Sequence, residues 1–126
     1  MKPDDDDVVI RYGTMRDRDS LVMAARTTFI RRRYYGLSMI SLPGMSAQAI
    51  AAVVAPRTRV TRGKMRSTRI GDLRSAGFEI ADHSDDGHLN VRFPDAPNEE
   101  TWERLEGIMG PAEAIRIGEP RGGEER

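Results

Sequence analysis

The chain has 126 residues, a net charge of zero, 38% hydrophobic residues and no cysteine. This length fits one domain, and the lack of cysteine excludes disulfides, thiolate zinc sites and a cysteine nucleophile. No apolar run approaches the roughly 18 residues of a membrane-spanning helix, and the start MKPDDDDVV lacks the basic and apolar regions of a signal peptide. These features predict a cytoplasmic protein without a membrane partner.

Charge is segregated along the chain. Residues 11–74 carry fourteen basic and three acidic side chains, whereas residues 75–126 carry five basic and thirteen acidic ones. This segregation favours either an anionic partner or charge pairing within the fold. The eighteen arginines and two lysines also match the codon bias of a GC-rich bacterial genome, so the position of the arginines is more informative than their number.

The predicted domain covers residues 8–117. Residues 1–7 are expected to be a disordered acidic lead-in, and residues 118–126 a disordered tail, because both are polar and carry little apolar surface to bury.

The first predicted elements are a strand and a long helix. The apolar run 8–12 predicts a short strand. Thr14 and Asp17 resemble a capping box, which predicts a helix over 17–33. Its expected core face, at helical periodicity, consists of Leu21, Val22, Ala25 and Phe29.

Two features of this helix do not belong to its core face. Met23 and Ile30 lie on the far side, so we expect either a second layer of the same chain or a partner chain to cover them. The triplet Arg31–Arg33 has two interpretations. It can stabilise the negative C-terminal end of the helix dipole, or it can bind an anionic ligand.

The basic middle of the chain follows. Residues 34–42 predict a strand that ends at Pro43. Ser46 is expected to cap a second helix, which Pro56 would stop. Residues 57–62 alternate and contain β-branched side chains, so they predict a polar edge strand. After a loop, Ser67 or Thr68 is expected to cap a short helix.

The clearest local pattern is a hairpin over residues 78–93. Two alternating runs flank the turn residues 84–87, where Gly87 can adopt a positive φ. The register that fits every position pairs Phe78 with Phe93, Glu79 with Arg92, Ile80 with Val91 and His83 with His88.

A final helix is expected over residues 98–109, followed by a short strand at 114–117. Its apolar stripe is predicted to consist of Trp102, Leu105 and Met109, and its acidic face of Glu99, Glu100, Glu103 and Glu106. The whole pattern predicts an α+β fold, a single two-layer domain with the order β-α-β-α-β-α-β-β-α-(β). Residues 57–117 have the order of a ferredoxin-like βαββαβ unit.

Candidate chemistry is sparse. His83 and His88, with the nearby aspartates, are a weak candidate for a metal site, because an exposed hairpin tip seldom excludes water. A serine nucleophile would need an adjacent base, and the hairpin register assigns both histidines to each other. No cofactor is predicted, because the chain has no glycine-rich phosphate loop, HExxH or GxSxG motif.

The basic middle contains a candidate anion-binding segment. Arginine guanidiniums together with hydroxyls at a helix N-terminus form a phosphate cradle. The candidate residues are Arg57, Arg59, Arg62, Lys64, Arg66, Ser67, Thr68 and Arg69.

These observations predict a small cytoplasmic bacterial interaction module that binds an anionic or protein partner through this segment. A toxin–antitoxin or defence role is among the expectations, and the partner is expected to be a protein or a second copy of the chain. One alternative is a nucleic-acid-binding protein, with RNA as its ligand. Another is a small enzyme that acts on a phosphate-bearing nucleotide.

Overall fold

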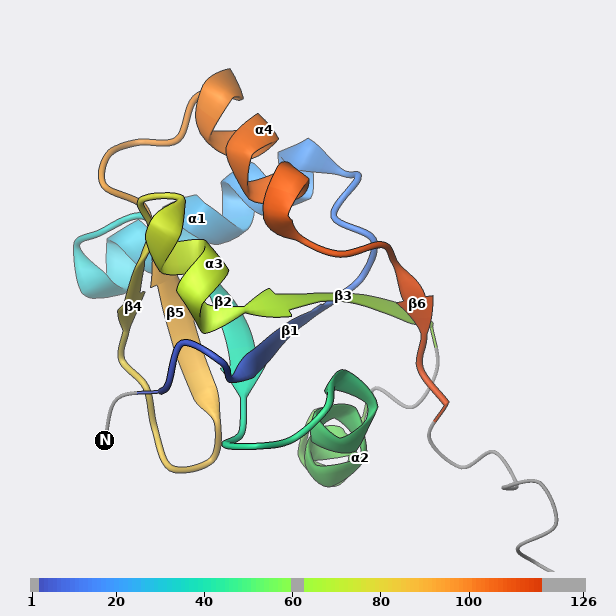
Figure 1. The fold of residues 1–126 in the computed structure, drawn as a ribbon. Helices are drawn as coiled ribbons and strands as arrows, with labels where there is room; N and C mark the ends of the chain where they lie inside the picture. Colours follow the sequence, from blue (N-terminus) through green and yellow to red (C-terminus); the bar gives the residue numbers. More distant parts are fainter. Residues whose placement is uncertain (1–2, 60–62, 117–126) are drawn as a thin grey trace, which may run out of the picture.

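The computed structural model describes residues 3–59 and 63–116. Within these ranges the strands and helices follow the predicted order, which confirms the α+β class (Figure 1). The elements are β1 (Val8–Tyr12), α1 (Arg18–Arg32), β2 (Gly36–Ser41), α2 (Ala47–Thr58), β3 (Lys64–Arg69), α3 (Ile70–Ser75), β4 (Glu79–Ala81), β5 (His88–Arg92), α4 (Glu99–Ile108) and β6 (Glu113–Ala114).

The strands form one antiparallel sheet in the order β4-β5-β2-β1-β3-β6. The second half of the chain has the element order of a ferredoxin-like unit, but β1 and β2 lie between β3 and β5 in the sheet. Residues 57–117 therefore do not form a contiguous ferredoxin-like sheet. The strand order depends on pairing between strands that are distant in sequence, and no local sequence pattern predicts that pairing.

The main core lies on one face of the sheet, beneath α1, α3 and α4. Successive strand residues point to opposite faces, so Val9 of β1 enters this core while the next residue, Ile10, faces the other side. Phe78 and Phe93 pack edge to face at 5.4 Å, and Phe93 packs in the same way on Trp102 of α4. These rings join the hairpin to the last helix.

Helix α2 lies against the opposite face of the sheet (Figure 1), and a smaller apolar cluster lies beneath it. Ile50 and Ala51 of α2 pack on Ile10 of β1 and Met65 of β3. On this face of β2 and β5, by contrast, Ser38 and His88 are exposed. The cover on the second face is therefore partial.

The cap of α1 differs from the prediction. Asp17 itself is the N-cap, and its carboxylate accepts a hydrogen bond from the Ser20 backbone N–H at 3.2 Å. Thr14 does not cap the helix. A short carboxylate directly before the first turn satisfies the free N–H groups, so the pair Asp17 and Ser20 provides what the capping box was expected to provide.

Helix α2 does not stop at Pro56. It continues to Thr58, and Arg59 is its C-cap with a left-handed φ of 59°. The missing N–H of Pro56 leaves only the Ala52 carbonyl without its helical donor, and Ala52 is an exposed residue that water can reach. The strand predicted over 57–62 is therefore wrong at 57–58, and residues 60–62 lie outside the described residues.

The predicted helix cap at Ser67 or Thr68 is also wrong. Residues 64–69 form β3, and α3 begins at Ile70, where Arg69 stands as N-cap without a side-chain hydrogen bond. Ile70 and Leu73 are buried, as expected. Burial of Met65 in the cluster beneath α2 favours a strand at residues 64–69 over a helix cap.

Residues 3–7, the described part of the predicted lead-in, lie against the start of α3. Backbone carbonyls of Asp7 and Asp5 accept from the N–H groups of Ile70 and Gly71 at 3.0 and 2.8 Å. These carbonyls satisfy the free donors of a helix that has no side-chain cap. Asp5 also forms an ion pair with Arg74 at the other end of α3.

The hairpin has the predicted register. Glu79 pairs with Arg92 and Ile80 with Val91. The regular pairing stops at Ala81, because Asp82 adopts a positive φ of 55°. The recorded pairs do not include His83 with His88, and His88 instead pairs with Ile40 of β2 on its other side.

Candidate functional site

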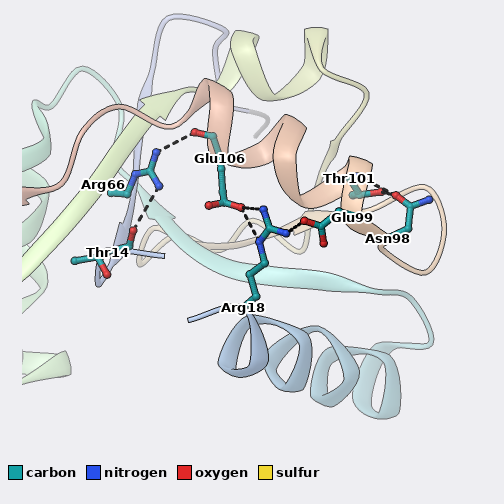
Figure 2. Close-up of polar contacts among 7 residues, drawn as sticks. All are labelled: Thr14, Arg18, Arg66, Asn98, Glu99, Thr101 and Glu106. Carbon is teal, nitrogen blue, oxygen red and sulfur yellow. Dashed lines mark hydrogen bonds and ion pairs between the residues drawn. The ribbon is translucent and has the colours of Figure 1, made fainter. Parts of the chain in front are cut away.

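The predicted anion-binding segment does not converge on one site, and Arg66 shows why (Figure 2). Its guanidinium donates to the carbonyl oxygens of Glu106, Met109 and Gly110 at 2.7 to 2.9 Å. These carbonyls belong to the C-terminal end of α4, which lacks intrahelical partners. Arg66 therefore caps a helix of its own chain.

The other segment residues point in different directions. Arg57 pairs with Asp86 at 3.7 Å, and Arg69 donates to the Asp6 carbonyl at 2.7 Å. Thr68 is buried and Ser67 half-buried on opposite faces of β3. Arg59 and Lys64 are exposed at the ends of their elements, and Arg62 lies outside the described residues. Since the two hydroxyls lie within a strand, there is no helix N-terminus for them to line.

The acidic face of α4 is partly neutralised by arginines of the fold (Figure 2). Arg18 of α1 binds Glu106 through two nitrogens, at 2.7 and 3.0 Å, and also contacts Glu99. Arg104 pairs with Glu100 at 3.0 Å. Part of the charge segregation in the sequence is thus pairing between α4 and the basic half of the chain.

Met23 and Ile30 lie on the open side of α1, with 68% and 74% of their surface exposed. Within residues 3–59 and 63–116, no second layer of the chain covers them. A partner chain or a second copy stays a prediction for this face.

The two histidines do not form a metal site with their neighbours. Across residues 3–59 and 63–116, no three His, Cys, Asp or Glu side chains gather as metal ligands would. His88 faces Ser38 instead, as described below.

One pocket among the described residues has a volume of about 370 Å³, and we call it the arginine pocket. It lies beside the part of the second sheet face that α2 leaves open. Its lining residues are Arg11, Ala24, Thr27, Thr28, Arg31, Arg32, Ser38, His88 and Asn90.

The arginine pocket forms where β1 and β2 separate. Their recorded pairing ends at Ile10 and Ile40, although β1 continues to Tyr12 along β3. Beyond this point Arg11 Nη1 donates to the Ser38 carbonyl at 2.6 Å. Burial lowers the pKa of the Arg11 guanidinium from its usual value, yet an arginine keeps its charge in proteins. The chain thus places a cation between two diverging strands.

Helix α1 connects these strands and forms the second wall. Its Leu21 and Ala25 belong to the main core, whereas Arg31 and Arg32 in its last turn line the pocket. Thr27 and Thr28 lie one turn earlier, and their hydroxyls donate to carbonyls within the helix. Both threonines line the same pocket as the two arginines.

The floor of the pocket contains a serine next to a histidine. Ser38 Oγ lies 2.6 Å from His88 Nε2. Both residues are exposed. The expectation that neither histidine is available to a serine is therefore wrong for His88.

One side of the floor is fixed by a second polar group. Asn90 is buried, and its Nδ2 donates to Tyr34 Oη at 3.0 Å and to Asp82 Oδ2 at 3.3 Å. Tyr34 Oη in turn donates to Asp82, which holds the pKa of that carboxyl below its usual range. Arg32 lies 3.9 Å from the same carboxylate.

Sequence reasoning missed this pocket because its residues come from four separate segments. Arg31 and Arg32 were singled out, and their helix-terminal position was the only local signal. Arg11, Ser38 and Asn90 lie in strands, and only the sheet pairing brings them beside α1. The polar residues His88 and Asn90 alternate with apolar residues in β5, a strand inside the sheet. This alternation was the sequence pattern that could have indicated a polar site on one face of the sheet.

No family model, curated protein or solved structure matches this chain. None of the helices in the described ranges combines the length and the hydrophobicity required to span a bilayer.

Proposed function

We propose that the protein is a binding module for an anionic partner and that the arginine pocket, rather than the segment 57–69, is its site. The supporting observation is that three guanidiniums, those of Arg11, Arg31 and Arg32, line one pocket. Charge-assisted hydrogen bonds from arginine forks are the usual means of binding phosphate and carboxylate groups. The bacterial, cytoplasmic and toxin- or defence-related setting stays a prediction.

The charge balance of the pocket supports this proposal. Among the described residues, Arg31 forms no ion pair with a carboxylate, and Arg11 binds only a backbone carbonyl. Asp82 approaches Arg32 alone, at 3.9 Å. The C-terminal end of α1 opposes an anion with about half a negative charge, which three full positive charges outweigh.

The test is an NMR titration of the protein with inorganic phosphate at low salt. We expect shifts of backbone amides in the pocket strands and the end of α1, and loss of these shifts in Arg31→Ala. Arg26→Ala is the matched control, because Arg26 is exposed on the same helix outside the pocket. Shifts confined to residues 57–69, or unaffected by Arg31→Ala, would contradict the proposal.

A second candidate function is an enzyme that acts on a phosphate ester. The contact between Ser38 Oγ and His88 Nε2 favours it, since a serine hydroxyl becomes a nucleophile when an adjacent base takes its proton. Hydrolysis of p-nitrophenyl phosphate tests this candidate. Activity should disappear in Ser38→Ala and His88→Ala and persist in Ser84→Ala, and a wild-type protein without activity would exclude it for this substrate.

A further inference from the structure

We infer that the ligand of the arginine pocket is a small molecule that carries a phosphate monoester. This inference rests on the proposed anion-binding function and specifies its ligand. Three observations carry it, namely the number of cations in the pocket, its volume, and the charges around its rim.

The cations match a terminal phosphate. A phosphate monoester carries about 1.5 to 2 negative charges at neutral pH and three free oxygens, and each guanidinium offers several donors in a planar fork. Arg11, Arg31 and Arg32 line the same pocket, so a group with three charged oxygens offers an acceptor to each of them. A phosphodiester has one charge and two free oxygens, so it would leave one of these three guanidiniums without a charged partner.

The volume leaves room for the group that carries the phosphate. About 370 Å³ falls at the lower end of small-molecule sites, which span roughly 300–1,000 Å³. Both donor hydrogens of Asn90 are directed at Tyr34 and Asp82, so the side-chain group that Asn90 can offer to a ligand is its carbonyl oxygen, an acceptor. A hydroxyl group on the ligand would supply the donor for this acceptor.

The rim argues against a polymeric ligand. Asp82 lies beside Arg32, and Asp86 accepts from the His88 backbone N–H at 3.0 Å. These carboxylates would repel the next phosphate of a nucleic acid strand. Beside these carboxylates Arg57 is paired with Asp86 and Arg92 with Glu79, so no basic track continues from the pocket on the side of the hairpin.

The test is calorimetric titration of the full chain with four probes. They are ribose 5-phosphate, dimethyl phosphate, a uridine decamer with a 5′-phosphate and the same decamer with a 5′-hydroxyl. We expect ribose 5-phosphate to bind at least tenfold more tightly than dimethyl phosphate and both decamers. Arg31→Ala should weaken it about tenfold to a hundredfold, the loss of one charge-assisted contact, whereas Arg26→Ala should change it less than twofold.

The outcomes separate this inference from the proposed function. Equal binding of the monoester and the diester, still dependent on Arg31, would overturn the ligand class and leave anion binding intact. Tighter binding of either decamer would assign the site to RNA and overturn the small-molecule ligand. No binding of any probe would overturn the ligand class, while the titration with inorganic phosphate decides anion binding separately. Circular dichroism of each variant checks its fold, which should persist because Arg31 and Arg26 are exposed.

Discussion

Among the basic residues of the middle segment, Arg66 should contribute most to the free energy of unfolding. Arg66→Ala removes the donors to three carbonyls at the end of α4. Leaving partly buried acceptors without donors costs about 1–3 kcal/mol, so we expect a decrease of about 2–3 kcal/mol in the free energy of unfolding. Urea denaturation measures it. Arg69→Ala, which removes one exposed contact, should lose less than about 1 kcal/mol, and equal losses would contradict the capping role.

The hydrogen bond from Tyr34 to Asp82 gives a prediction on pH. The folded-state pKa of Asp82 is lowered, first by this hydrogen bond. A lowered carboxyl pKa contributes stability above the unfolded pKa of about 3.9 and loses it as pH falls through the folded value. Tyr34→Phe should therefore raise the Asp82 pKa and weaken the acid dependence of stability below about pH 4. Carboxyl-detected NMR measures the pKa directly, and an unchanged value would contradict this account.

Single residues also show what the sequence can and cannot reveal. The partners of Ile80 and Glu79 were predictable, because both strands of the hairpin lie within a few residues of their turn. The partner of His88 was not, since Ser38 lies fifty residues away. The positive φ of Asp82 ends the strand pairing just before His83. Aspartate can adopt this conformation, but its presence in a sequence does not predict it.

At the level of elements, Pro56 provides the next prediction. It lies inside α2 two residues before the end. A proline in a helix interior costs about 3 kcal/mol relative to alanine, and the cost is smaller in a last turn, so Pro56→Ala should stabilise the protein by about 1–2 kcal/mol. Thermal and urea unfolding measure this change.

Pro43→Ala is the control for that measurement. Pro43 is exposed between β2 and α2, and its replacement reports only the extra freedom that the unfolded chain gains. It should destabilise slightly. A Pro56→Ala variant that also loses stability would show that the helix carries no strain at this position.

The elements that were predicted incorrectly are those in the basic middle. The runs 57–62 and 64–69 both alternate and both contain β-branched residues, so local pattern cannot rank them. Packing decides between them: the second run places Met65 in the cluster beneath α2. The cap at Ser46 was predicted correctly, because a cap is a contact within four residues.

For the whole molecule, the exposed face of α1 makes a prediction about assembly. If a second copy or a protein partner covers Met23 and Ile30, the double variant Met23→Asp, Ile30→Asp should abolish that association. Since both residues are exposed in the single chain, its free energy of unfolding should change by less than about 0.5 kcal/mol per site. Sedimentation velocity and urea unfolding measure the two effects. A wild-type monomer at all concentrations would exclude a homo-oligomer.

The order of elements along the chain was predictable, whereas the order of strands in the sheet was not. Hydrophobic periodicity reports each element locally. The insertion of β1 and β2 between β3 and β5 is a choice among long-range pairings with no local signature. The arginine pocket depends on that choice, since it lies where β1 leaves β2.

Strands β2 and β5 place alternate residues in the main core, and two of the residues between these are exposed on the other face. Leu37, Met39 and Leu89 are buried, while Ser38 and His88 between and beside them are exposed. Packing therefore constrains the buried residues, whereas the exposed residues between them do not hold the core together. If the arginine pocket binds an anion as proposed, point substitutions at Ser38 and His88 should alter its specificity without repacking the core, which would suit directed evolution of anion receptors.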